Sequence, residues 1–272
     1  MKTENRTVSE IILHIPHSST RIPGECRRLF FLKGPAPRRE LLRMTDAYTD
    51  VLFCLPGLPV QNRAVFPYSR LVCDVERFRD DAQEPMAARG MGVCYTAASD
   101  LRPLKAVPPE HRQAMLALYD RHHAGLTAAV DRSLARTGTA LMIDCHSFAS
   151  RRLPYETAPE TARRPDICIG TDPDFHTPGW LAACLCSAFA EKGYTVAVNE
   201  PFGGTLVPMK HYCRDSRVLS AMIEVNRGLY MDEETGLRSR GFAALQADIR
   251  DMLEGLTARL AEETGIGGVQ KA

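Results

Sequence analysis

The sequence predicts an α/β fold with a mixed, largely parallel central sheet flanked by helices. Short apolar runs alternate with longer segments of helical periodicity, as they do in sheets built from strand–helix units. The apolar run at 141–143 leads to His146, so a predicted buried strand delivers a histidine to its C-terminal end, where open α/β sheets carry their chemistry. No internal repeat or clear linker divides the 272 residues, and we expect residues 1–272 to form a single domain.

The N-terminal part of the chain predicts a strand followed by a helix. Residues 11–15 are largely apolar and are stopped by Pro16, which is typical of a short strand. Apolar residues at helical spacing then predict one helix within 39–55. Asp46 and Asp50 would lie one turn apart on another face of that helix.

The next segments alternate between strand-like and loop-like patterns. Residues 60–75 are strand-like, although Pro67 indicates an edge strand or a break. Residues 76–108 show little periodicity, so we expect a long functional loop there rather than a core element. Helical spacing returns over 108–136, with a proline near the start, where helices accept it.

The C-terminal half predicts the rest of the sheet and the helices that cover it. Apolar runs predict strands at 139–145, 166–170, 194–199 and 218–225. Helical patterns predict helices at 178–192 and 239–263. The alternation implies a sheet that is covered on both faces.

The composition excludes several classes of partner. The 34 basic and 33 acidic residues leave a net charge of +1 without a dense basic block, so we expect no nucleic-acid partner. The polar start lacks the apolar core of a signal peptide, and no stretch approaches the roughly 18 apolar residues of a membrane span. The nine cysteines are odd in number and scattered, as reduced thiols are. We therefore expect a soluble, cytoplasmic protein of open oligomeric state.

Two histidines at strand ends, together with acids, suggest a metal-dependent hydrolase. A catalytic zinc usually keeps three protein ligands, often histidine nitrogens and a carboxylate oxygen, and leaves one position for water. His17, Asp46 and His146 could supply that set. His17 lies beyond the end of its strand and is a better ligand candidate than His14, whereas Asp46 could equally belong to a solvated helix face or a helix cap.

Charged residues also interrupt or flank other apolar runs. Glu224 lies in a run that should be a buried strand, and an unpaired buried carboxylate is costly, so a cationic partner or a functional role is implied. The structural alternative is a salt bridge to Arg227 or another basic residue. Arg70 and Arg77 surround a further apolar run, and their planar forks suit an acidic substrate, although ordinary surface arginines would look the same.

Several other positions allow a structural as well as a functional role. Gly203 and Gly204 follow a predicted strand, and they either let the backbone approach a ligand closely or form an ordinary turn. His211 is a further candidate for a functional role. Three histidines on the predicted helix at 108–136 are expected to face solvent: His111, His122 and His123. Ser147 adjoins a histidine, but the chain has no G-x-S-x-G elbow, which argues against a nucleophilic serine.

Five segments, in order along most of the chain, resemble the N-formylglutamate amidohydrolase family. They are 14–19 (HIPHSS), 69–77 (SRLVCDVER), 144–148 (DCHSF), 199–204 (NEPFGG) and 223–231 (IEVNRGLYM). That family looks like a distant branch of the zinc carboxypeptidases and aspartoacylases. The resemblance implies a phosphorylase/hydrolase-like α/β fold with one catalytic Zn²⁺, in which His146 matches a ligand and Glu224 the base. No glutamate lies three residues after His17, unlike in zinc carboxypeptidases, and Asp46 is the candidate for the carboxylate ligand by its position in the family pattern.

The resemblance also implies a reaction, the hydrolysis of N-formyl-L-glutamate to L-glutamate and formate in histidine degradation. Glu224 would move the proton and Arg70 would help to stabilise the oxyanion. The candidates for contacts with this small acidic N-acyl amino acid are Arg70, Arg77, Arg227, Asn226, Gly203, Gly204 and His211. Two alternatives stay open: a zinc amidohydrolase for another N-acyl amino acid or small peptide, and a non-catalytic protein that binds an acidic ligand.

Overall fold

A six-stranded sheet forms the centre of the computed structural model, which describes residues 11–156 and 164–264. The strands are β1 (Ile11–Ile15), β2 (Arg63–Val65), β3 (Ala140–Phe148), β4 (Ile167–Gly170), β5 (Val196–Val198) and β6 (Val218–Asn226). Their order across the sheet is β2-β1-β3-β6-β4-β5. Strands β2, β1, β3 and β6 are parallel, whereas β4 runs antiparallel to β6 and pairs in parallel with β5. The sheet is therefore mixed and largely parallel, as the sequence predicts.

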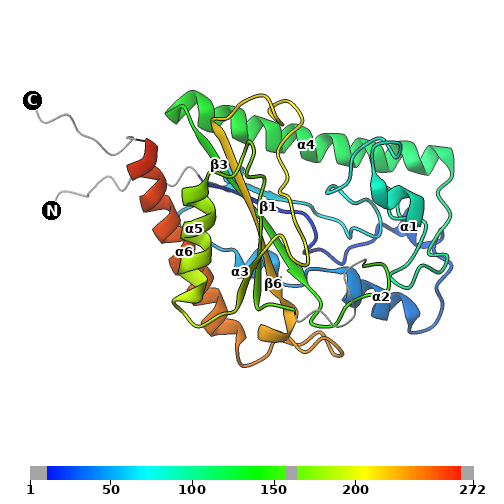
Figure 1. The fold of residues 1–272 in the computed structure, drawn as a ribbon. Coiled ribbons are helices and arrows are strands. Elements are labelled where there is room, and N and C mark those ends of the chain that lie inside the picture. The colour runs from blue at the N-terminus through cyan, green and yellow to red at the C-terminus, as the bar shows by residue number, and fades with distance from the viewer. Residues whose placement is uncertain (1–10, 157–163, 265–272) are drawn as a thin grey trace, which may run out of the picture.

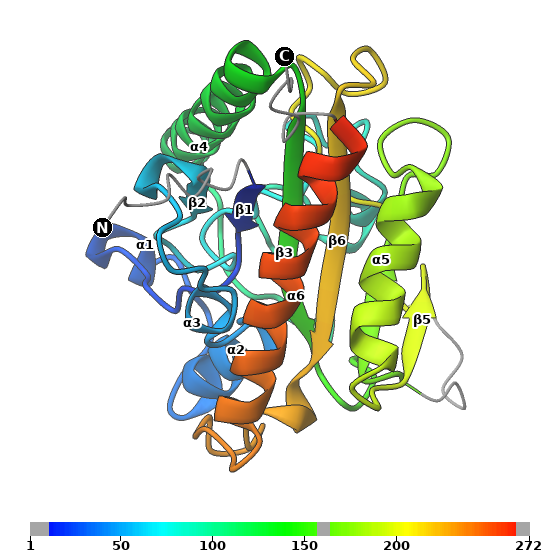
Figure 2. The ribbon, with the colours of Figure 1, turned by 90° about the vertical axis from the view of Figure 1, so that its left-hand side faces the viewer.

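Helices cover both faces of this sheet. They are α1 (Gly24–Arg27), α2 (Ala36–Met44), α3 (Thr49–Leu52), α4 (Pro109–Thr137), α5 (Gly179–Ala190) and α6 (Phe242–Thr264). Helix α4 packs against β1, β2 and β3, whereas α5 packs on β4 and β5 and pairs with α6. Figure 1 shows α4 along one side of the sheet and α5 with α6 on another, and Figure 2 shows α6 in front of β3 and β6. Within the described ranges, no helix has the length and apolar character needed to cross a bilayer.

Side-chain alternation along the strands separates an apolar face from a face that turns polar. Leu13 and Ile143 point toward α3, α5 and α6 in the largest core cluster. Ile12 and Met142 point the other way and pack against α4. Toward the C-terminal ends of the strands, this second face carries buried polar side chains: His14, Asp144, His146 and Glu224. The polar residues therefore gather where the sheet extends past the apolar contact with α4.

The helix predicted within 39–55 is wrong as a single element, because the chain forms α2 and α3 with a break between them. In the break, the Asp46 N–H donates to the His17 carbonyl oxygen (3.0 Å), and Tyr48 adopts a left-handed backbone conformation with φ 68°. Asp46 and Asp50 therefore do not share a helix face. Tertiary contacts override the local helical pattern here.

The other predicted elements agree more closely with the structure. Within 60–75 only β2 is a strand, and it is an edge strand that ends before Pro67. Residues 76–108 form a long loop that contains one 3₁₀ helix, η2 (Pro85–Arg89). Strand β3 continues past the predicted end at 145 to Phe148, so His146 lies within the strand.

Candidate metal and active site

Two histidines and a carboxylate converge beside the C-terminal ends of β1 and β3. His17 follows β1, Asp46 lies in the break between α2 and α3, and His146 belongs to β3. All three side chains are buried. Asp46 Oδ2 lies 3.6 Å from His17 Nδ1 and 3.1 Å from His146 Nδ1, a spacing that can hold one metal ion. The structure thus brings together the three residues selected from the sequence as ligands, and their role as ligands stays a prediction.

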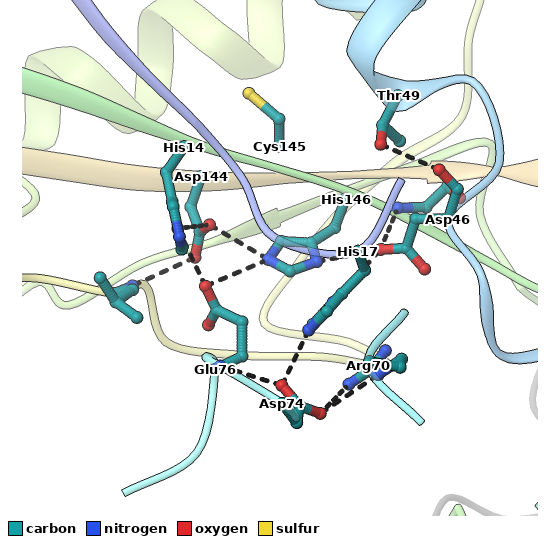
Figure 3. A network of polar contacts seen from close by, with 12 residues as sticks. His14, His17, Asp46, Thr49, Arg70, Asp74, Glu76, Asp144, Cys145 and His146 are labelled. Carbon is teal, nitrogen blue, oxygen red and sulfur yellow. Dashed lines mark hydrogen bonds and ion pairs between the residues drawn. The ribbon is translucent and has the colours of Figure 1, made fainter. Parts of the chain in front are cut away.

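Each histidine of this group is held from behind by a carboxylate. His17 Nε2 bonds to Asp74 Oδ1 (2.8 Å), and His146 Nε2 bonds to Asp144 Oδ1 (3.1 Å). Figure 3 shows the His146 ring with polar partners on both sides. A carboxylate behind a metal-binding histidine fixes the orientation of the ring and makes its other nitrogen a better donor to a metal. The arrangement therefore suits two histidine ligands that present their Nδ1 atoms.

Asp46 is ionised in this buried setting. Burial alone raises the pKa of its carboxyl, but the adjacent His146 and His17 side chains and the charge of Arg227 hold that pKa well below its ordinary value. Arg227 Nη2 donates to Asp46 Oδ1 (2.8 Å), which leaves Oδ2 directed at the histidines. The ionised carboxylate is the form that binds a cation.

One ring nitrogen, Nδ1 of His17, distinguishes the His17 group from two other groups with comparable spacing. Those groups are His14 with Glu76 and Asp144, and Asp172 with His176 and Cys213. Both ring nitrogens of His14 and of His176 already have polar partners. His17 Nδ1, in contrast, is buried and has no hydrogen-bond partner among the described residues. A buried polar atom without a partner requires an explanation, and a divalent ion bound by histidine and carboxylate donors provides one.

Glu224 lies directly opposite His146 in the register of β3 and β6. Its side chain is buried, and Oε2 has no hydrogen-bond partner within the described part of the chain. Burial raises the pKa of Glu224 from 4.5 to about 7, against a lowering effect of His146. A carboxyl group with such a pKa can accept a proton and return it near neutral pH. Its role as a base stays a prediction.

The structure adds a polar network around His14 that the sequence analysis missed. His14 Nδ1 lies 2.9 Å from Asp144 Oδ1 and 3.0 Å from Glu76 Oε1, and Nε2 lies 2.8 Å from His122 Nε2. Burial lowers the pKa of His14, but the two carboxylates raise it to about 9. A signal for part of this network was present, because Asp144 and His146 are two residues apart and so share one face of a strand.

The predicted solvent exposure of the histidines on α4 is wrong. His122 and His123 are both half-buried, His122 against His14 and His123 against the Val75 carbonyl oxygen (2.9 Å). His111 is half-buried as well. The reason is that the loop before α4 packs on this helix in a separate core cluster, which the local charge pattern does not reveal.

The three arginines predicted to contact substrate are all engaged by the protein. Arg70 donates from Nε (3.1 Å) and Nη2 (2.8 Å) to Asp74 Oδ2. All three side-chain nitrogens of Arg77 donate to protein oxygens, and so do those of Arg227. Arg70 lies close enough to lower the pKa of Glu224. Substrate contacts by these arginines stay predictions.

The predicted glycine pair lies beside the polar network. Gly203 and Gly204 line a cavity of about 300 Å³ together with Glu76, Arg77 and Asp144. Gly204 has a φ of 82°, which favours glycine. The glycine pair therefore lies at the edge of the site, and a contact of these glycines with a ligand stays a prediction.

Two other predicted substrate contacts have structural partners. Asn226 caps a 3₁₀ turn, η3 (Arg227–Leu229), and its Nδ2 donates to the Pro165 carbonyl oxygen (3.1 Å). His211 bonds to Asp131 of α4 (2.9 Å). His211 precedes the start of β6, whereas Glu224 is near its end, so the structure does not bring His211 to the ligand group.

Comparison with known proteins shows the family to which the chain belongs. A model of the N-formylglutamate amidohydrolase family matches residues 9–231. The chain belongs to this family. It is similar to the crystal structure of N-formylglutamate amidohydrolase from Ralstonia eutropha JMP134, with 25% identity, a TM-score of 0.78 and 97% of each chain covered. A search of curated proteins finds no match.

The fold is also similar to that of gene product Atu2144 from Agrobacterium tumefaciens, with 18% identity, a TM-score of 0.63, and 93% of this chain and 92% of that chain covered. At this identity, the likeness concerns the fold alone. Family membership makes the protein an amidohydrolase, an enzyme that acts on an amide bond. The buried polar residues beside β3 and β6 accordingly form the candidate active site.

Proposed function

We propose that the protein hydrolyses N-formyl-L-glutamate to L-glutamate and formate with one Zn²⁺ held by His17, Asp46 and His146. Family membership supports the reaction class. The observation that carries the proposal is the unpartnered Glu224 Oε2 opposite His146, beside a histidine Nδ1 that also lacks a partner among the described residues. In this proposal the reaction belongs to histidine degradation in the cytoplasm.

Several residues of the chain have separate roles in the proposed reaction. When bound, the ion would polarise the formyl carbonyl and acidify water. Glu224 accepts a proton from the water that attacks the formyl carbon, and it returns the proton to the amine nitrogen as the C–N bond breaks. Arg70, held by Asp74, offers positive charge to the developing oxyanion. Asp74 and Asp144 keep the histidine rings in place.

Formate release by the purified protein tests this function. N-formyl-L-glutamate is supplied to the protein as isolated, after chelation, and after zinc is restored. We expect activity to disappear with chelation and to return when zinc is restored, because the proposed reaction requires the bound ion. N-acetyl-L-glutamate and a short peptide serve as comparison substrates. Absence of formate under every metal condition would contradict the proposal, and preference for another acyl group would redirect it.

A further inference from the structure

Arg164 lies near the end of β6, in the segment that leads into β4. The two residues that follow it contact Asn226, because the Pro165 carbonyl oxygen accepts from Asn226 Nδ2 (3.1 Å) and the Asp166 carbonyl oxygen accepts from the Asn226 N–H (2.9 Å). Asn226 is two residues beyond Glu224 on the same strand. These two hydrogen bonds hold the segment that carries Arg164 at the end of the sheet where the candidate site lies.

The guanidinium of Arg164 is buried against aromatic rings. Its side chain is 9% exposed, and its central carbon lies 4.8 Å from the ring centroid of Phe148 and 5.5 Å from that of Phe202. Nη1 donates to Glu156 Oε2 (2.5 Å). The two rings and this carboxylate fix the plane of the guanidinium, so the side chain is oriented before any ligand binds.

One edge of this guanidinium has no hydrogen-bond partner in the part of the chain that the structure describes. Nε and Nη2 of Arg164 are both buried, and neither has a hydrogen-bond partner among the described residues. Leaving buried charged donors without hydrogen-bond partners is unfavourable, because they have lost their contacts with water. The Nε and Nη2 hydrogens lie in the guanidinium plane and point in parallel from one edge, which is a geometry that binds a carboxylate with two hydrogen bonds.

We propose that Arg164 binds the side-chain carboxylate of an N-acyl dicarboxylic amino acid, an inference that rests on the proposed function. Phe148, on which Arg164 stacks, is two residues beyond the candidate ligand His146 on the same face of β3, about 6.6 Å further along the strand. In extended N-formylglutamate, the formyl carbon and the side-chain carboxyl carbon are about 6 Å apart. A formyl group beside His146 therefore places the remote carboxylate within reach of Arg164.

The other three arginines near the site are already engaged by protein oxygens, which makes them less suited to bind this carboxylate. Arg77 and Arg227 have committed every side-chain nitrogen to protein oxygens, and Arg70 directs two of its nitrogens at Asp74. Arg164 is the arginine whose two adjacent buried nitrogens lack partners within the described ranges. Glu156 acts as a positioning residue, because it holds the opposite edge of the same guanidinium.

Kinetics with paired substrates test the inference. N-formyl-L-glutamine replaces the remote carboxylate with an uncharged amide of similar shape. We expect Arg164→Gln to lower kcat/KM for N-formyl-L-glutamate by about 10- to 100-fold, mainly through KM, with little change for N-formyl-L-glutamine. Arg164→Lys should restore part of the preference, since it keeps the charge without the fork. Arg217→Gln is the matched control, because Arg217 is exposed and pairs with Asp215 before the start of β6.

A binding measurement separates this inference from the proposed function. Calorimetry with L-glutamate and L-glutamine, on zinc-loaded protein, does not depend on turnover. We expect Arg164→Gln to weaken L-glutamate binding by a similar factor while circular dichroism and the zinc content stay unchanged. An unaltered preference for L-glutamate in both Arg164 variants would overturn the role of Arg164. If the wild type releases no formate but its binding of glutamate still depends on Arg164, the proposed reaction is wrong and the carboxylate site remains supported.

Discussion

Glu224 owes its candidate role to its surroundings. An exposed glutamate is ionised at neutral pH and is a weak base, whereas burial raises the pKa of Glu224 to about 7. Asp46 is buried to a similar extent but has the opposite shift, because Arg227 and two histidines compensate its charge. Two carboxyl groups in one site therefore differ in pKa, which suits one to remain ionised and the other to gain and lose a proton near neutral pH.

Replacement of Glu224 by glutamine should remove the proton acceptor and leave the packing nearly unchanged. We expect kcat to fall by about 10²- to 10⁴-fold without loss of zinc. In the wild type, kcat/KM should decrease as the pH falls below about 7, because protonation removes the base. Formate release from about pH 5.5 to about pH 8.5, with zinc content measured in parallel, checks both expectations. A Glu224→Gln variant with zinc and near-full turnover would show that another group moves the proton.

Strand β4 packs closely against the loop that contains Gly203 and Gly204. Gly170 ends β4 and pairs with Met222 of β6, and a Cβ added at this position would collide with the Gly204 carbonyl oxygen and the Met222 side chain. Because the nearest atom belongs to the backbone, a change of rotamer cannot relieve the contact. The absence of a side chain at Gly170 therefore lets the loop approach the strand.

Gly170→Ala should consequently destabilise the protein and displace the loop. We expect the free energy of unfolding to fall by about 1–3 kcal/mol, as in other overpacked interiors. Gly255→Ala is the matched control, because a Cβ at Gly255 in α6 meets no atom within 4 Å and should stabilise the helix by about 0.5–1 kcal/mol. Urea unfolding of both variants measures the difference. Equal stability of the two variants would mean that the loop shifts without cost.

The ligand group joins parts of the chain that are distant in sequence. His17 follows the first strand of the sheet, Asp46 lies between two short helices, and His146 comes from the central strand β3. An ion bound by all three would favour the folded state over the unfolded chain, in which these residues are far apart. Metal binding and global stability should therefore be linked in this protein.

Chelation should lower the melting temperature of the whole molecule. Free zinc at about a hundred times its Kd stabilises a folded protein by about 2.7 kcal/mol, which corresponds to roughly 5–10 °C for a chain of this size. Calorimetry of chelated and zinc-restored protein measures this shift. A His17→Ala variant should lose it, whereas His211→Gln, outside the ligand group, should keep it. An equal shift in His17→Ala would place the ion elsewhere.

Local patterns were sufficient for most of the fold and for part of the site. Continuous apolar runs predict β3 and β6, because buried strands need apolar side chains on both faces, and the structure confirms them. Polar residues in such runs are conspicuous for the same reason, which is how His146 and Glu224 could be selected. Asp46 required the family resemblance as well, since its own surroundings predicted a helix.

The sequence by itself therefore determined the α/β class, the strands and the polar residues that those strands carry. Only the tertiary structure decided that the helix pattern breaks at Asp46 and that the histidines of α4 are half-buried. It also decided that Arg164, beside two aromatic rings, has an edge without hydrogen-bond partners among the described residues. The physical reason is that periodicity reports the interactions of a residue with its neighbours in sequence. Hydrogen bonds and burial supplied by distant segments leave no trace in that local pattern, although they fix which atoms remain free for chemistry.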